Sequence, residues 1–149
     1  MTAADPAYPL IGPRRDPGDY RGALTLALNR RGDVLLQLRD DIEGIIAPGY
    51  WGFFGGGVEP GEDLQEAAAR EFEEEAGLTL APPMFEPFAT VVSSLPPHGL
   101  LYIHRLQTPV EARDLRLGEG AGFAFCSRRQ WEQLDLIPYL RPVLEFLFD

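Results

Sequence analysis

Short runs in which hydrophobic and polar residues alternate predict several β-strands along the chain. Residues 22–29 and 34–38 flank an Arg-Gly-Asp turn, which indicates a hairpin. Charges, glycines and a proline predict a loop over residues 39–50, and three consecutive glycines after Phe54 are expected to break the next strand. The remaining predicted strands cover residues 51–54, 85–94, 100–108 and 122–126.

The clearest helix signal lies in residues 63–76, where strong helix formers run from an acidic first residue to Gly77, a typical C-terminal stop. Ser127 and Gln130 form a capping-box pattern, and a final helix is predicted from about Pro138 to Phe148. Strands and helices are therefore mixed, which favours the α+β class.

The length of 149 residues and the absence of a linker-like segment predict a single domain over residues 1–149, with residues 1–19 as a loosely ordered extension. Cys126 is the only cysteine, so an internal disulfide is excluded and a small buried side chain is expected. No signal-like or membrane-spanning run is evident, so we expect a cytoplasmic protein that does not bind membranes.

The formal charge of −10, from 23 acidic and 13 basic residues, disfavours a nucleic acid polymer as partner. A small phosphorylated substrate remains compatible with this charge if cations mediate the contact.

The acidic residues of the segment 63–76 are not confined to one solvated face. At about 100° per residue, Glu71 and Glu75 fall within about 20° of Leu64 on the apolar stripe, and Glu74 lies about 80° away. Carboxylates on a packed face repel one another and lose hydration, so a compensating cation is needed. A hard divalent cation such as Mg²⁺, with Mn²⁺ as a substitute, satisfies that need.

The segment from Gly56 to Leu78, GGVEPGEDLQEAAAREFEEEAGL, matches the pattern G-x5-E-x7-R-E-U-x-E-E-x-G-U at every position, where U is a bulky apolar residue. This pattern is the Nudix box, and the chain therefore resembles the Nudix hydrolases. The resemblance implies the Nudix fold, a mixed β-sheet sandwiched between helices. It also implies Mg²⁺-dependent cleavage of a diphosphate linkage in a small nucleoside diphosphate derivative, and relatives often form homodimers.

The resemblance also assigns roles to residues of the box. It implies that Glu71, Glu74 and Glu75 bind the metal, with Glu62 at the edge of the cluster. It implies that Arg70 holds a carboxylate in place and that Gly56 and Gly57 let the backbone approach the cleft, although a purely structural role for these glycines is an equal alternative.

Residues outside the box give weaker expectations. The resemblance implies that a glutamate is the general base: either Glu71 in the box or, outside it, Glu119 in the turn Gly118-Glu119-Gly120, where a solvated loop acid is an equal alternative. Arg21 and Arg39 are candidate substrate contacts, and Phe54 could stack on a base, although aromatic residues of a short strand more often belong to the core.

Two further interpretations of the acidic helix remain open at this point. The domain could bind a nucleotide without hydrolysing it, although such modules usually lose box carboxylates and this chain keeps them all. The helix could also serve only protein contacts or solubility, in which case it would bind no divalent cation.

Overall fold

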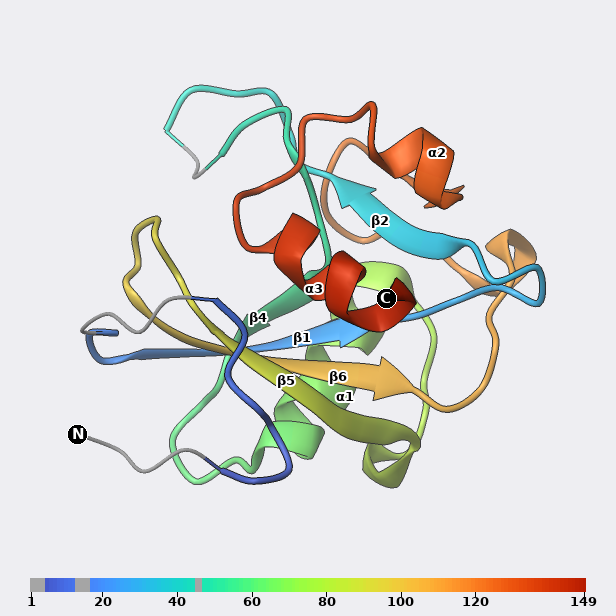
Figure 1. Ribbon diagram of the computed structural model, residues 1–149. Coiled ribbons are helices and arrows are strands. Elements are labelled where there is room, and N and C mark those ends of the chain that lie inside the picture. Colours follow the sequence, from blue (N-terminus) through green and yellow to red (C-terminus); the bar gives the residue numbers. More distant parts are fainter. Residues whose placement is uncertain (1–4, 13–16, 45–46) are drawn as a thin grey trace.

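The computed structural model describes residues 5–12, 17–44 and 47–149 and places two sheets between helices (Figure 1). The larger sheet has the strand order β4-β1-β6-β5, and the smaller has the order β3-β2-β7. The strands are β1 (Tyr20–Leu26), β2 (Val34–Leu38), β3 (Trp51–Gly52), β4 (Phe54–Gly57), β5 (Phe85–Val92), β6 (Gly99–Leu106) and β7 (Gly122–Cys126). The helices are α1 (Leu64–Ala76), α2 (Arg128–Trp131) and α3 (Leu140–Phe148), with short 3₁₀ turns at Pro82–Met84 and Ala112–Asp114.

The larger sheet is mixed, because β1 runs parallel to β6 while its other pairings are antiparallel. α1 covers one face of this sheet and α3 the other, each over its own hydrophobic core (Figure 1). Phe72 of α1 is fully buried in one core, and Leu144 of α3 is fully buried in the other. The predicted α+β class and the mixed sheet between helices are therefore confirmed.

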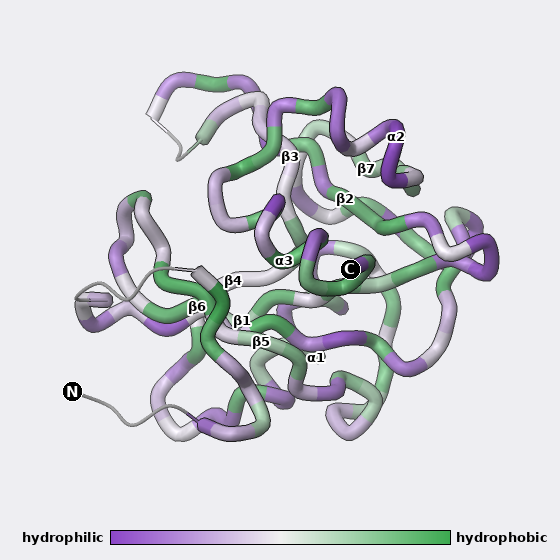
Figure 2. Tube along the Cα trace, viewed as in Figure 1, coloured by the Kyte–Doolittle hydropathy of each residue, from purple (hydrophilic) through white to green (hydrophobic). Residues whose placement is uncertain are grey.

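The ends of α1 follow from its sequence. The Asp63 carboxylate accepts a hydrogen bond from the Glu66 N–H at 2.8 Å and caps the N-terminus. Gly77 has a φ of 73° and donates its N–H to the Glu73 carbonyl, which ends the helix. The capping box of Ser127 with Gln130 is also present, at the start of the one-turn helix α2. Figure 2 shows α2 as a hydrophilic segment and β1 as a hydrophobic one, in agreement with their surface and core positions.

One prediction for the strands holds in part and another is wrong. The expected hairpin is present but short: Leu28 and Val34 form an antiparallel bridge and Leu35 donates its N–H to the Ala27 carbonyl at 2.9 Å, after which β1 and β2 diverge into different sheets. The glycine run does not end the strand: β4 includes all three glycines, since their backbone pairs with β1 from Gly22 to Leu24. Only the residue between β3 and β4, Phe53, interrupts the extended segment.

The described part of the N-terminal segment packs against the larger sheet. Tyr8 is 4% exposed and hydrogen-bonds His104 at 2.8 Å, while Ile11 donates its N–H to the carbonyl of Thr90 in β5. This stretch is attached, in contrast to the loosely ordered extension expected for residues 1–19, of which 1–4 and 13–16 lie outside the described residues. Within the described ranges, no helix has the length and apolarity needed to cross a bilayer.

Candidate active site

Three glutamates of α1 face the glycine strand β4 to different extents. Glu75 is 6% exposed, and its carboxylate accepts a 2.7 Å hydrogen bond from the Gly55 N–H. Glu71 is largely buried, whereas the Glu74 side chain keeps 59% of its surface exposed. Burial of Glu71 and Glu75 agrees with the angular argument from the sequence, and Glu74 lies at the solvent edge of the same face.

The glycines of β4 make room for these carboxylates. A Cβ atom on Gly56 would lie 2.5 Å from the carboxyl carbon of Glu71, which is far inside van der Waals contact. Gly55 has a φ of 155°, and a Cβ there would meet the Ala23 carbonyl at 2.4 Å. The acid side chains can therefore approach this strand because Gly55 and Gly56 have no side chains there.

Arg70 joins the acidic residues on either side of it. Its guanidinium donates to both carboxylate oxygens of Glu62, at 2.7 and 2.9 Å, and to Glu71 at 2.8 Å. It also donates to the Gly57 carbonyl at 2.9 Å, and Glu74 lies 3.5 Å away. A planar guanidinium suits this forked arrangement, which fixes the loop before α1 and the Glu71 carboxylate together.

The electrostatics show that Arg70 does not neutralise the whole group. Burial raises the pKa of Glu75 to about 8, with further contributions from the negative charges of Glu119 and Glu71. Burial also raises the pKa of Glu71, against the opposing effect of Arg70. Because Glu71 and Glu75 lie close together and both have raised pKa values, the site should favour an added positive charge.

The described residues contain no three acidic, histidine or cysteine side chains already gathered as a metal-binding cluster. Glu71 is turned toward Arg70 and Glu74 toward solvent, so their oxygen atoms do not converge. The donors nevertheless suit a hard divalent cation, because they are carboxylate oxygens on one helix face with uncompensated charge. Glu71, Glu74 and Glu75 are the residues that could hold it.

The loop that carries Glu119 lies across the C-terminal end of α1. The Gly118 N–H donates to the main-chain carbonyl of Glu75 at 2.7 Å, and Gln37 of β2 donates to the Glu119 carbonyl at 2.9 Å. Glu119 is exposed, and its charge acts on both Glu71 and Glu75. The two candidates for the general base therefore lie at the same site, one in the helix and one in this loop.

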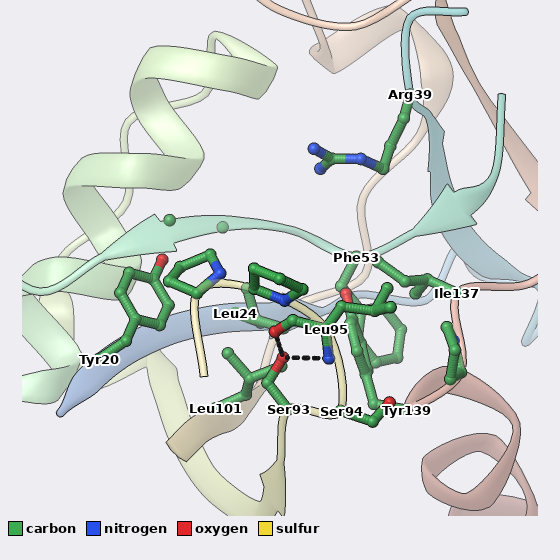
Figure 3. Close-up of a pocket in the computed structure, with 15 residues that line it drawn as sticks. Tyr20, Leu24, Arg39, Phe53, Ser93, Ser94, Leu95, Leu101, Ile137 and Tyr139 are labelled. Carbon is green, nitrogen blue, oxygen red and sulfur yellow. Dashed lines mark hydrogen bonds between the residues drawn. The ribbon is translucent and has the colours of Figure 1, made fainter. Parts of the chain in front are cut away.

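A pocket of about 160 Å³ adjoins the carboxylates, with Gly55 and Gly56 as the common wall. Its lining combines aromatic and aliphatic side chains, and Arg39 is the only charged residue among the described residues that line it. Figure 3 shows Tyr20 and Arg39 entering from different walls, with Phe53 beside Tyr139. The lining residues are Tyr20, Leu24, Arg39, Phe53, Gly55, Gly56, Ser93, Ser94, Leu95, Pro96, Pro97, Leu101, Ile137, Pro138 and Tyr139.

The structure separates the candidate substrate contacts. Arg39 lines the pocket, but Arg21 points to the opposite face of β1, where its guanidinium lies 5.5 Å from the ring centroid of Tyr102. The assignment of Phe54 to substrate is wrong, because Phe54 is 1% exposed and packs edge-on against Phe72 of α1. Side chains alternate along an extended chain, so its neighbour Phe53 faces the pocket instead.

Sequence reasoning missed Tyr20 and Gln37. The Tyr20 hydroxyl lies near the charges of Glu71 and Glu75, which help burial to raise the pKa of the phenol. Gln37 stands at a buried position in an otherwise apolar strand, and that polar residue in an apolar run was the available signal.

A model of the NUDIX domain matches residues 19–145, which include the carboxylate helix, the glycine strand and every described residue that lines the pocket. This chain belongs to the NUDIX-domain family. The nucleoside triphosphatase NudI of Escherichia coli is 50% identical over 44 residues, which are 30% of this chain and 30% of that protein. The first curated relatives are matched over only 21 to 34% of their own lengths.

Solved structures share the fold of this NUDIX domain over nearly its whole length. The MutT protein of Methanosarcina mazei covers 95% of this chain and 94% of its own, with a TM-score of 0.67 and 25% identity. A bifunctional NMN adenylyltransferase/ADP ribose pyrophosphatase from Francisella tularensis, complexed with AMP and an Mn ion, covers 91% of this chain and 42% of its own, with a TM-score of 0.68. At 11% identity, the second likeness concerns the fold alone.

Proposed function

We propose that this protein is a Mg²⁺-dependent hydrolase that cleaves the diphosphate linkage of a nucleoside diphosphate derivative. The observation that carries the proposal is the placement of the buried Glu75 and the largely buried Glu71 next to a pocket that contains Arg39. Membership of the NUDIX-domain family and the partial match to a nucleoside triphosphatase support the same reaction class. Mn²⁺ is expected to replace Mg²⁺.

The pocket is suited to the nucleoside part of the substrate. Apolar and aromatic walls favour a planar base, and Arg39 offers donors to phosphate or base oxygens. A nucleoside held there would direct its diphosphate across Gly55 and Gly56 toward Glu71 and Glu75. Nucleotide sugars, ADP-ribose-like compounds and nucleoside triphosphates all meet this description.

The chain's own residues would perform distinct tasks in the reaction. Glu71, Glu74 and Glu75 would hold the cation, and Glu62 would keep Arg70 in the orientation that fixes Glu71. A bound divalent cation neutralises charge on the diphosphate oxygens and helps to activate the attacking water. Glu71 or Glu119 would accept the proton from that water.

The direct test is turnover of a nucleotide panel with Mg²⁺ or Mn²⁺, followed by detection of a nucleoside monophosphate. Glu75→Gln and Glu74→Gln should each weaken cation binding in calorimetry and lower kcat, because each removes a negatively charged ligand. Glu73→Gln is the matched control, since Glu73 is exposed on the opposite side of the same helix. No turnover of any panel member by the unmodified protein would refute the proposed activity.

Two variants separate the candidates for the general base. If Glu71 accepts the proton, Glu71→Gln abolishes turnover and Glu119→Gln retains most of it. If Glu119→Gln abolishes turnover while Glu71→Gln does not, the loop residue is the base. Cation binding measured on both variants distinguishes loss of the base from loss of the metal.

A further inference from the structure

Gln37 occupies an inward position where β2 is otherwise apolar. Its side chain is 4% exposed, and Leu35, two residues earlier on the same face, is 1% exposed in the core beneath α1. A buried amide without partners is strongly unfavourable, so its contacts must explain its presence in this strand.

Both contacts of the Gln37 side chain lead to the candidate active site. Its Nε2 donates to the main-chain carbonyl of Glu119 at 2.9 Å, and the Gln37 amide lies close enough to the Glu75 carboxylate to lower the pKa of that group, against the larger effect of burial. A carbonyl and a carboxylate are both acceptors, so the two hydrogens of the amide NH₂ can serve both partners. The buried amide of Gln37 thus lies between the Glu75 carboxylate and the loop that carries Glu119.

The loop around Glu119 is closely fitted to this amide. Ala121 donates its N–H to the Leu38 carbonyl at 2.9 Å, and a Cβ on Gly120 would lie 3.0 Å from the Gln37 Nε2. Gly120 also has a φ of 96°, which L side chains rarely adopt. A side chain at this position would therefore crowd Gln37 and strain the backbone of the turn.

We infer that Gln37 is a positioning residue that holds Glu75 and the Glu119 loop in register with each other. This inference rests on the proposed hydrolase function. Gln37 does not line the nucleoside pocket, so it acts through the two groups that it contacts. Its loss should therefore change the rate of the chemical step and leave nucleoside binding nearly intact.

The test is Gln37→Met, which keeps the length of the side chain and removes the amide. With a nucleotide that the unmodified protein hydrolyses, kcat should fall about 10- to 100-fold while KM changes less than about twofold. Gln37→Asn is the second variant, because it retains an amide that is too short to reach both partners. If Gln37→Met does not fold, Gln37→Asn should show the same fall in kcat with little change in KM.

A second measurement requires neither metal nor turnover. Hydrogen exchange at the Gly118 and Ala121 amides should accelerate about tenfold or more in Gln37→Met, because the loop loses its side-chain anchor. Thr90→Val is the matched control, since it removes another buried hydrogen bond, from Thr90 Oγ1 to the Tyr8 carbonyl, away from the site. Thr90→Val should leave both kcat and loop exchange unchanged.

The outcomes distinguish this inference from the proposed function. If the unmodified protein hydrolyses no nucleotide, the proposed function is refuted. Hydrogen exchange at the loop amides then tests by itself whether Gln37 anchors the loop. A folded Gln37→Met variant with normal loop exchange, or with normal kcat where turnover exists, overturns the positioning role. An equal fall of kcat in Thr90→Val also overturns it, because the effect would then reflect general destabilisation.

Discussion

We expect acidification to destabilise this protein through His104, a fully buried residue of β6 that contacts the N-terminal segment. The ring Nδ1 lies 3.1 Å from the Leu24 carbonyl, and the Nε2 lies 2.8 Å from the Tyr8 hydroxyl. A carbonyl can only accept, so Nδ1 carries the proton and Nε2 accepts from Tyr8. The neutral imidazole therefore satisfies both contacts.

The magnitude follows from the pKa of that ring. Burial lowers the pKa of His104 to about 4 from 6.5, against smaller opposing effects of the Leu24 and Tyr102 backbone and the Asp63 charge. At pH values between these two pKa values, the unfolded chain binds a proton at His104 that the folded chain does not bind. The free energy of unfolding therefore falls as the pH decreases through this range. The loss amounts to about 3 kcal/mol by pH 4.

Urea unfolding from pH 7 to pH 4 checks this expectation by comparison with His104→Gln, which has no titrating ring at this position. The stability difference between the two proteins should be constant above the ordinary histidine pKa and shrink as the pH falls below it. Both proteins contain the same carboxylates, so the effect of carboxylate titration on stability cancels in the difference. Parallel stability curves, or a ring that titrates near 6.5 in the folded protein by NMR, would refute the reasoning.

Three substitutions test other parts of the structure. Gly56→Ala should reduce kcat by about 100-fold, because its Cβ displaces the Glu71 carboxylate, while Gly122→Ala, with open space around it, serves as the control. A Gly56→Ala enzyme with normal kcat would contradict the proposed use of that carboxylate. Asp63→Ala should lower the midpoint of urea unfolding through loss of the α1 cap, and an unchanged midpoint would contradict this expectation. Tyr8→Phe should cost about 1–3 kcal/mol in the same assay by leaving a buried ring nitrogen unpaired, and an unchanged free energy of unfolding would contradict the role of this contact.

The carboxylate helix could be predicted from the sequence because its determinants are local. The cap at Asp63, the stop at Gly77 and the burial of Glu75 depend on residues within a few turns of one another. Sequence spacing therefore predicted both the bounds of the helix and the face on which its acids lie.

The pocket could not be predicted in the same way. Its walls come from β1, from the turn that includes Ser93 and from the segment that ends at Tyr139, and no periodicity links these segments. The exchange of Phe53 and Phe54 has a similar origin, since the strand expected over residues 51–54 is divided at Phe53 and is too short for its alternation to assign faces. Gln37 was visible as a polar residue in an apolar run, but its partners lie more than thirty-five residues away along the chain.

The glycines of β4 and the glutamates of α1 form one physical unit. A strand of glycines is unfavourable in conformational entropy, and buried acids are unfavourable in hydration, so each feature alone would destabilise the fold. Together they are compatible, because the bare backbone of Gly55 supplies an N–H to Glu75 and the missing Cβ of Gly56 admits Glu71. Burial, the main cause of the raised pKa of Glu75, still disfavours the charged carboxylate, and a bound cation would offset that cost. A side chain added at Gly56 should therefore weaken the site, because it would occupy the space that the Glu71 carboxylate now fills.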